Sequence, residues 1–163
     1  MEIRKMMTMM VAAVAIVLGV SSCSSSDDEP EVAVATQVVG SYSGNEIIKV
    51  MGEESSNTTT TYVFAKATDT TIDMTIPESG EMGAMMIPSL PVKNIPLVKN
   101  GNTITGNMAS YSGTVTNASG AEKAYTISNI AVVFGENKAV VTFSLKYGNM
   151  PMAMETTFTG TKK

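Results

Sequence analysis

Histidine and tryptophan are missing from this 163-residue sequence, and cysteine occurs only once. Without histidine, the chain cannot form the Ser–His or Cys–His pairs that activate a nucleophile, nor offer imidazole ligands to a metal. Without a second cysteine, no disulfide can form within the chain, so the fold must depend on its hydrophobic core. We therefore predict no enzyme activity, no catalytic residue, no metal site and no cofactor.

Charge is also scarce. Charged residues make up 16% of the chain and the formal net charge is −4. Four of the acids, Asp27, Asp28, Glu29 and Glu31, stand close together in one polar stretch, so the remainder is nearly neutral. Because a nucleic-acid-binding surface needs a basic patch or stripe, the composition argues against nucleic acid as a partner.

The N-terminal residues follow the pattern of a secretory signal. Arg4 and Lys5 precede an uncharged run over 6–20 that is shorter than the roughly 20 residues of a membrane-spanning helix. The run ends at Val20-Ser21-Ser22-Cys23, which resembles a bacterial lipobox. The resemblance implies a signal peptide over 1–22, cleaved just before Cys23, and a lipid on the Cys23 thiol that binds the protein to a membrane. The alternative is an ordinary signal peptide followed by a spare thiol.

Residues 23–36 are predicted to be a flexible, lipidated tether, because Ser, Asp, Glu and Pro bury too little apolar area to fold. The residue after the cysteine is Ser24 rather than aspartate, which by the same resemblance argues against retention at an inner membrane. The acidic run that follows resembles an export signal to the outer face of the outer membrane. We expect a lipid-anchored protein at the cell surface, with the periplasmic face of the outer membrane as the alternative.

The rest of the chain alternates apolar and polar residues with a period of two, as in 71–76 and 141–147. This pattern, rich in Thr, Val, Ile and Tyr, is typical of half-buried antiparallel strands. The predicted strands cover 38–51, 58–66, 70–77, 92–98, 103–108, 111–117, 123–134, 138–147 and 152–161. The proline-containing segment 82–98 is expected to be an edge or an irregular crossing. No helix is predicted, and a closed barrel is favoured over a sandwich because closure removes exposed edges.

Three stretches resemble one family: Gly40-Ser41-Tyr42-Ser43-Gly44, the segment 87–95, and the C-terminal segment 150–160. Together they are similar to the calycin-like β-barrel domain found in lipoproteins of Gram-negative gut bacteria, over about 37–163. The resemblance implies an all-β, single antiparallel up-and-down barrel of about eight strands, like those of calycins and lipocalins. It also implies that a small apolar ligand could lie within the barrel.

The last two strands give the clearest prediction of an interior face. Val141, Phe143, Leu145 and Tyr147 share one phase, and Met152, Met154 and Phe158 share another, with polar residues between them. A slip of one residue would bury Glu155 and Lys146, so the register is well determined. The candidate ligand-binding residues are Tyr42, Phe143, Tyr147, Met152, Met154 and Phe158.

Three other features allow two interpretations each. Glu46 shares the phase of Tyr42 and Ile48, which would turn it inward, but we favour a bulge near Gly44-Asn45 that turns it outward, since an unpaired buried charge is costly. We see no second acid in the inward phase. The methionine clusters at 82–86 and 150–154 fit core packing better than a Cu(I) site. Asp69-Thr70-Thr71 resembles an O-glycosylation sequon of gut Gram-negative bacteria, so Thr70 is either a modification site or an ordinary turn residue.

The predicted function is non-catalytic. A surface lipoprotein would bind a small apolar or amphipathic ligand in its barrel, or a protein partner at the barrel rim. The alternative is a structural or accessory surface protein whose barrel is filled by its own side chains. An eight-stranded barrel is just wide enough for either outcome.

Overall fold

A computed structural model describes residues 31–80 and 86–163. The chain divides into two units, Met1–Val32 and Ala33–Lys163, and the second contains every helix and strand of the described residues. The predicted signal peptide, Cys23 and most of the predicted tether lie outside the described residues.

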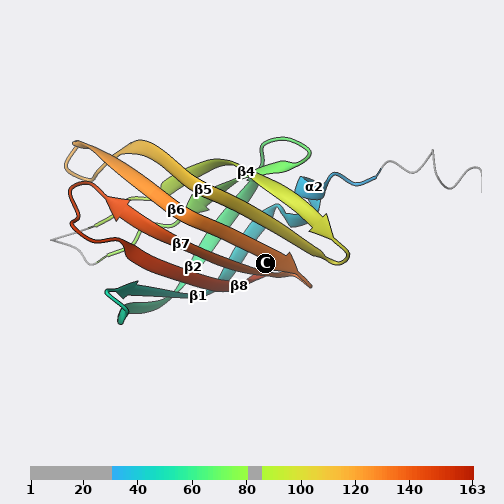
Figure 1. Cartoon of the computed structure of the whole chain (residues 1–163), viewed down its shortest axis with the longest axis horizontal. Helices are drawn as coiled ribbons and strands as arrows, with labels where there is room; N and C mark the ends of the chain where they lie inside the picture. The colour runs from blue at the N-terminus through green and yellow to red at the C-terminus, as the bar shows by residue number, and fades with distance from the viewer. Residues whose placement is uncertain (1–30, 81–85) are drawn as a thin grey trace, which may run out of the picture. The chain divides into compact units, whose positions relative to one another are not determined.

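The second unit is a closed barrel of eight antiparallel strands that follow one another in chain order, with β1 and β8 paired to complete the ring (Figure 1). The predicted all-β up-and-down barrel is therefore confirmed. The elements are α2 (Val34–Val38), β1 (Gly40–Val50), β2 (Glu53–Lys66), β3 (Thr71–Ile76), β4 (Leu90–Asn100), β5 (Thr103–Thr116), β6 (Glu122–Gly135), β7 (Lys138–Tyr147) and β8 (Met154–Lys162).

The inward faces follow the alternation of the sequence. In β7, all four residues of the predicted inward set are buried, and Phe158 of β8 is fully buried. Glu155 and Lys146 are exposed, so the predicted register of this hairpin is confirmed. The barrel closes between β1 and β8 where Gly44 pairs with Gly160. A Cβ on Gly44 would collide with the carbonyl oxygen of Thr159, so glycine is required there for the two backbones to approach.

The structure has one strand fewer than the nine predicted, because 103–108 and 111–117 are parts of β5. The alternation in the sequence is interrupted there, but the strand continues. The residues that face inward change from even-numbered to odd-numbered positions within it. Ile104 and Gly106 are buried in the first half, whereas Tyr111, Gly113 and Val115 are the less exposed residues in the second. β6 changes phase at the same level, where Asn129 has a positive φ of 53°.

From Leu90 onward the proline-containing segment is a strand, β4, which corrects the expectation of a crossing. The expected irregularity is present within it, because the register with β3 shifts at Lys93-Asn94 and Asn94 has a positive φ of 59°. Its pairing with β5 covers only Leu97–Asn100, so Pro91 and Pro96 lie in a part of β4 that has a partner on the β3 side alone. That part of β4 resembles an edge strand, where proline is tolerated. On the side that faces β5, this part of β4 is therefore an edge, as expected.

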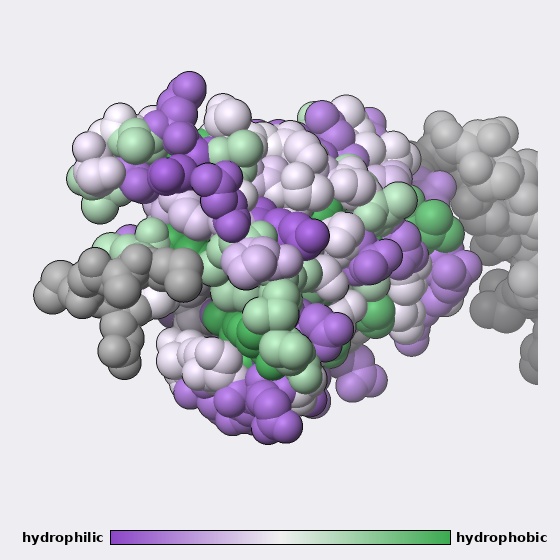
Figure 2. Space-filling view, turned by 60° about the vertical axis from the view of Figure 1, so that its left-hand side comes forward, coloured by the Kyte–Doolittle hydropathy of each residue, from purple (hydrophilic) through white to green (hydrophobic). Residues whose placement is uncertain are grey.

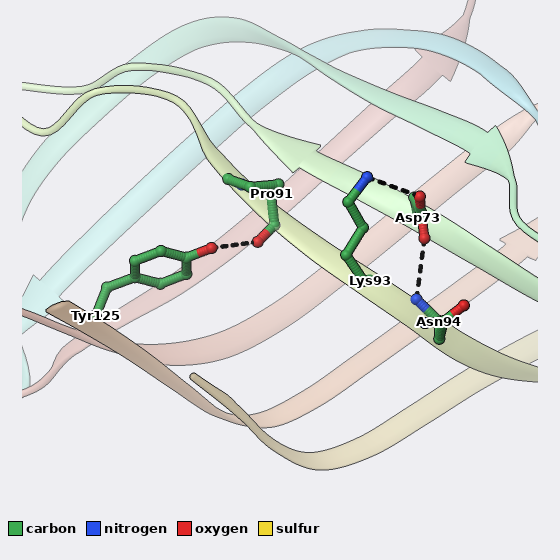
Figure 3. Close-up of polar contacts among 5 residues, drawn as sticks. All are labelled: Asp73, Pro91, Lys93, Asn94 and Tyr125. Carbon is green, nitrogen blue, oxygen red and sulfur yellow. Dashed lines mark hydrogen bonds and ion pairs between the residues drawn. The ribbon is translucent and has the colours of Figure 1, made fainter. Parts of the chain in front are cut away.

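Polar contacts hold β4 on both sides of this region (Figure 3). The Lys93 ammonium lies 2.8 Å from the Asp73 carboxylate of β3, and the backbone N–H of Asn94 donates to the same carboxylate at 3.0 Å. From β6, the Tyr125 hydroxyl donates to the carbonyl oxygen of Pro91 at 2.5 Å, and burial raises the pKa of Tyr125 to about 12. The Tyr125 ring lies over Gly113 of β5, where a Cβ would come within 2.7 Å of its hydroxyl oxygen. Tyr125 thus spans the part of the barrel where β4 and β5 do not pair.

One end of the barrel, here called the α2 end, is closed by the short helix α2 (Figure 1). Ala35 and Val38 of the helix are buried, and the Tyr42 hydroxyl donates to the Val38 carbonyl oxygen at 3.1 Å. Tyr42 packs against Phe64 and Phe134 in an aromatic cluster. The sequence predicted neither this helix nor its burial: the folded unit begins at Ala33, inside the stretch assigned to the tether.

Candidate ligand pocket

A pocket of about 740 Å³ lies at the barrel end opposite α2, here called the open end. Figure 2 shows hydrophobic surface gathered at this end and surrounded by hydrophilic residues. The pocket is lined by residues of β1, β2, the β3–β4 connection and the segment that leads into β8. They are Glu46, Ile48, Val50, Ser55, Ser56, Thr58, Thr59, Thr60, Glu78, Ser79, Gly80, Ile87, Met150, Pro151, Met152 and Met154.

The pocket exists because neighbouring strands differ in length. β2 has 14 residues and β3 only 6, and the two pair only over Val63–Lys66. The preceding part of β2 has no strand partner on that side among the described residues. The chain returns toward the barrel through a bridge between Ser79 and Ile87, and Ile87 is buried. The space between this connection and β2 is the pocket.

The two walls of the pocket differ in chemistry. β1 and β8 contribute the apolar side chains of Ile48, Val50 and Met154, with Ile87 from the β3–β4 connection. β2 contributes the hydroxyl-bearing side chains of Ser56, Thr58 and Thr60, and Ser55 and Thr59 complete that side. One side of the pocket therefore suits a hydrocarbon and the other can exchange hydrogen bonds.

Glu46 is the one buried carboxyl group of the described residues, with 3% of its surface exposed. Its Oε2 atom accepts a hydrogen bond of 2.5 Å from the Tyr62 hydroxyl. Burial raises the pKa of Glu46, and the Tyr62 hydrogen bond opposes that rise in part. The described residues contain two ion pairs, Lys66–Asp69 and Lys93–Asp73, and neither includes Glu46. The buried carboxyl thus has a hydroxyl partner and no cation.

The inward position of Glu46 corrects the favoured expectation that a bulge turns it outward. β1 runs regularly through Gly44 and Asn45, and Glu46 pairs with Thr58 on one side and Phe158 on the other. The register shift between β1 and β2 comes later, between Ile48 and Lys49. A second acid, Glu78, also lines the pocket. It is exposed on the connection between β3 and β4 and does not belong to the inward face of a strand, where no second acid was expected.

Below Glu46 the barrel is solidly packed. The Tyr62 and Phe158 rings stack with their centroids 4.2 Å apart and their planes inclined by 24°, and both side chains are fully buried. Burial and the Glu46 carboxylate raise the pKa of Tyr62 well above its ordinary value, so the hydroxyl stays a neutral donor. The pair lies next to the lining residue Glu46, which accepts from Tyr62, and is itself outside the pocket lining.

Residues 38–161 match the calycin-like β-barrel domain family. The matched span is most of the chain and includes every residue of the eight strands except Lys162, the last residue of β8. The chain belongs to this family. The resemblance found in the sequence is thereby confirmed.

This calycin-like barrel is also similar to a crystal structure from Bacteroides fragilis, described as a "putative outer membrane protein", with a TM-score of 0.64 and 18% sequence identity. The match covers 82% of this chain and 54% of the other, so this chain spans about half the length of that protein. No curated protein matches the sequence. Among the described residues, no helix has the length and apolar character needed to cross a membrane.

The six candidate ligand-binding residues do not form one site in the calycin-like barrel. Met152 and Met154 line the pocket, although Met152 precedes β8 and is 43% exposed rather than inward-facing. Phe158 is outside the pocket lining and stacks on Tyr62, and Tyr42 lies at the α2 end. Phe143 and Tyr147 are buried outside the pocket lining, and the Tyr147 hydroxyl has no hydrogen-bond partner among the described residues. Ligand binding by any of the six stays a prediction.

The pocket residues that the sequence did not predict are mostly those of β2. The prediction began this strand at 58, whereas β2 begins at Glu53. Ser56, Thr58 and Thr60 have the inward phase of Tyr62 and Phe64, which was the available signal. This signal is weak, because a run of serine and threonine is also typical of a solvated loop.

Two further candidates lie away from the pocket. Thr70 is exposed in the turn between β2 and β3, as predicted, and its modification stays a prediction. Met82 and Met85 lie outside the described residues, and Met86 is 38% exposed.

Proposed function

We propose that this calycin-like barrel is a non-catalytic, lipid-anchored outer-membrane protein that binds a small amphipathic ligand in the open-end pocket. The observation that supports binding is the pocket itself, which combines apolar side chains with hydroxyl groups and the buried Glu46 carboxyl. Its volume of about 740 Å³ is within the range of roughly 300–1,000 Å³ that small-molecule sites occupy.

The proposal of a non-catalytic role rests on the residues available at the pocket. Among its lining residues, the ionisable side chains are Glu46 and Glu78, and the hydroxyl groups have no histidine to activate them because the chain contains none. Glu46 is held by Tyr62 inside the barrel, whereas Glu78 is exposed on the β3–β4 connection. Binding and orientation of a ligand are what this arrangement supports.

The proposed location rests on the sequence around Cys23 and on the name given to the Bacteroides fragilis protein of the same fold. Two or more acyl chains hold a protein stably on a membrane, which a single chain does only marginally. The surface-facing side of the outer membrane is the proposed side, because three serines and then the acidic residues Asp27, Asp28 and Glu29 follow the cysteine.

Binding can be tested by mass spectrometry of small molecules released from the full-length protein purified from its native host. Val50→Trp would place a large ring in the pocket, and Val63→Trp, on the outward face of β2, is the matched control. Both variants should keep the β-sheet circular dichroism spectrum of the wild type. We expect a compound that is released from the wild type and from Val63→Trp but not from Val50→Trp.

If no compound is released from any of the three proteins, or if the same compounds come from all of them, the pocket is not a binding site. The result would then favour the alternative of an accessory surface protein whose barrel serves as a rigid scaffold.

A further inference from the structure

The charged residues that line the open-end pocket are all acidic. They are Glu46, which is buried, and Glu78, which is exposed, and the lining that the described residues form contains no lysine or arginine. A fatty acid or another anionic amphiphile would bring its charge toward these carboxyl groups. The pocket therefore disfavours the anionic ligands that would otherwise suit its apolar wall.

The pocket also contains an unused acceptor. Glu46 Oε2 is occupied by the Tyr62 hydroxyl, and Oε1 has no hydrogen-bond partner among the described residues. The groups around the carboxyl are neutral: the Tyr62 hydroxyl and the Thr58 and Thr60 side chains on β2, and Thr156 and Phe158 on β8. A carboxylate buried without a cation is costly, and a ligand that supplies a cation would remove that cost.

We propose that the pocket selects amphiphiles with an ammonium head group, which pairs with Glu46 while the hydrocarbon lies against Ile48, Val50 and Met154. An ammonium group has three N–H donors. One can reach Glu46 Oε1, and the other two face the hydroxyl-bearing side chains of β2, which can accept hydrogen bonds. This inference rests on the proposed function and specifies the class of ligand for the same pocket.

Three probes with the same hydrocarbon chain and different head groups test the inference. Decylamine, decanol and decanoate are titrated by isothermal calorimetry, below their aggregation concentrations and near neutral pH, into the full chain carrying Cys23→Ser. Calorimetry is suitable because the protein has no tryptophan to report binding by fluorescence. We expect decylamine to bind about ten- to a hundredfold more tightly than decanol, because a hydrogen bond between charged groups increases the affinity by about this factor. Decanoate should bind more weakly than decanol.

Two variants test whether Glu46 is responsible for the preference for decylamine. Glu46→Gln keeps the size of the side chain and its ability to accept from Tyr62, and it should reduce the affinity for decylamine to that for decanol. Glu155→Gln is the matched control, since Glu155 is an exposed acid of β8 next to the lining residue Met154 and is itself outside the pocket. It should leave all three affinities unchanged.

The outcomes separate this inference from the proposed function. If decanol binds but decylamine does not bind more tightly, or if the preference for decylamine survives Glu46→Gln, the ammonium inference is wrong and the pocket remains a binding site. If none of the probes binds, both proposals are contradicted. If Glu46→Gln does not fold, the order of the three affinities for the protein with the wild-type pocket still tests the ammonium inference.

Discussion

The contrast between the packed interior and the open-end pocket can be measured with two truncations. Phe143 of β7 is 4% exposed, belongs to the continuous hydrophobic core and does not line the pocket. Phe143→Ala removes a whole ring from a site enclosed by other side chains, so it adds a cavity to the lost burial. We expect the free energy of unfolding to fall by about 3–5 kcal/mol.

Met154→Ala is the comparison. Met154 is partly buried and lines the pocket, so its truncation enlarges an existing opening instead of creating an enclosed void. Full burial of a methionine side chain contributes roughly 1.5–3 kcal/mol, so a partly buried one should cost less than about 2 kcal/mol. Phe143→Leu, which keeps an apolar side chain at the position, should be milder than Phe143→Ala.

Urea unfolding followed by far-ultraviolet circular dichroism measures these differences. A domain of this size has a total stability of about 5–15 kcal/mol, so Phe143→Ala should remain folded in the absence of urea yet unfold at a much lower concentration. A loss below about 1.5 kcal/mol for Phe143→Ala, or equal losses for Phe143→Ala and Met154→Ala, would refute the distinction between a packed interior and an open pocket.

Three further predictions concern single residues. Burial raises the pKa of Glu46 above its ordinary 4.5, so the Glu46 carboxyl binds its proton more tightly in the folded protein than in the unfolded chain. The folded protein therefore loses stability as the pH rises from 4.5 through the raised pKa. The free energy of unfolding of Glu46→Gln relative to the wild type should therefore increase as the pH rises above 4.5, and a difference that stays constant in urea unfolding would contradict the buried carboxyl. Cys23→Ser should release the protein from the membrane fraction, and a variant that still resists carbonate extraction from outer membranes would disprove the lipid anchor. The peptide that contains Thr70, from protein made in the native host, should carry a glycan by mass spectrometry; an unmodified peptide would show that Thr70 is an ordinary turn residue.

The sequence alone determined that the domain consists of alternating strands, and it determined the inward face of β7. Alternation is a local property, since neighbouring side chains of a strand point to opposite faces whatever the strand pairs with. For this reason Val141, Phe143 and Leu145 could be assigned to the interior without knowledge of their partners. The succession of alternating strands, each with one apolar face, also led to the prediction of a closed barrel, because closure leaves no unpaired edge.

Only the tertiary structure decided where the barrel opens and what lies there. The pocket depends on the difference in length between β2 and β3, and Glu46 faces it because β1 continues without a bulge through Gly44 and Asn45. Tyr62, which is far from Glu46 in the chain, supplies the hydrogen bond that makes the buried carboxyl tolerable. Strand pairing, partner identity and the space left between elements are set by residues distant in sequence, so the period of a single strand carries no information about them.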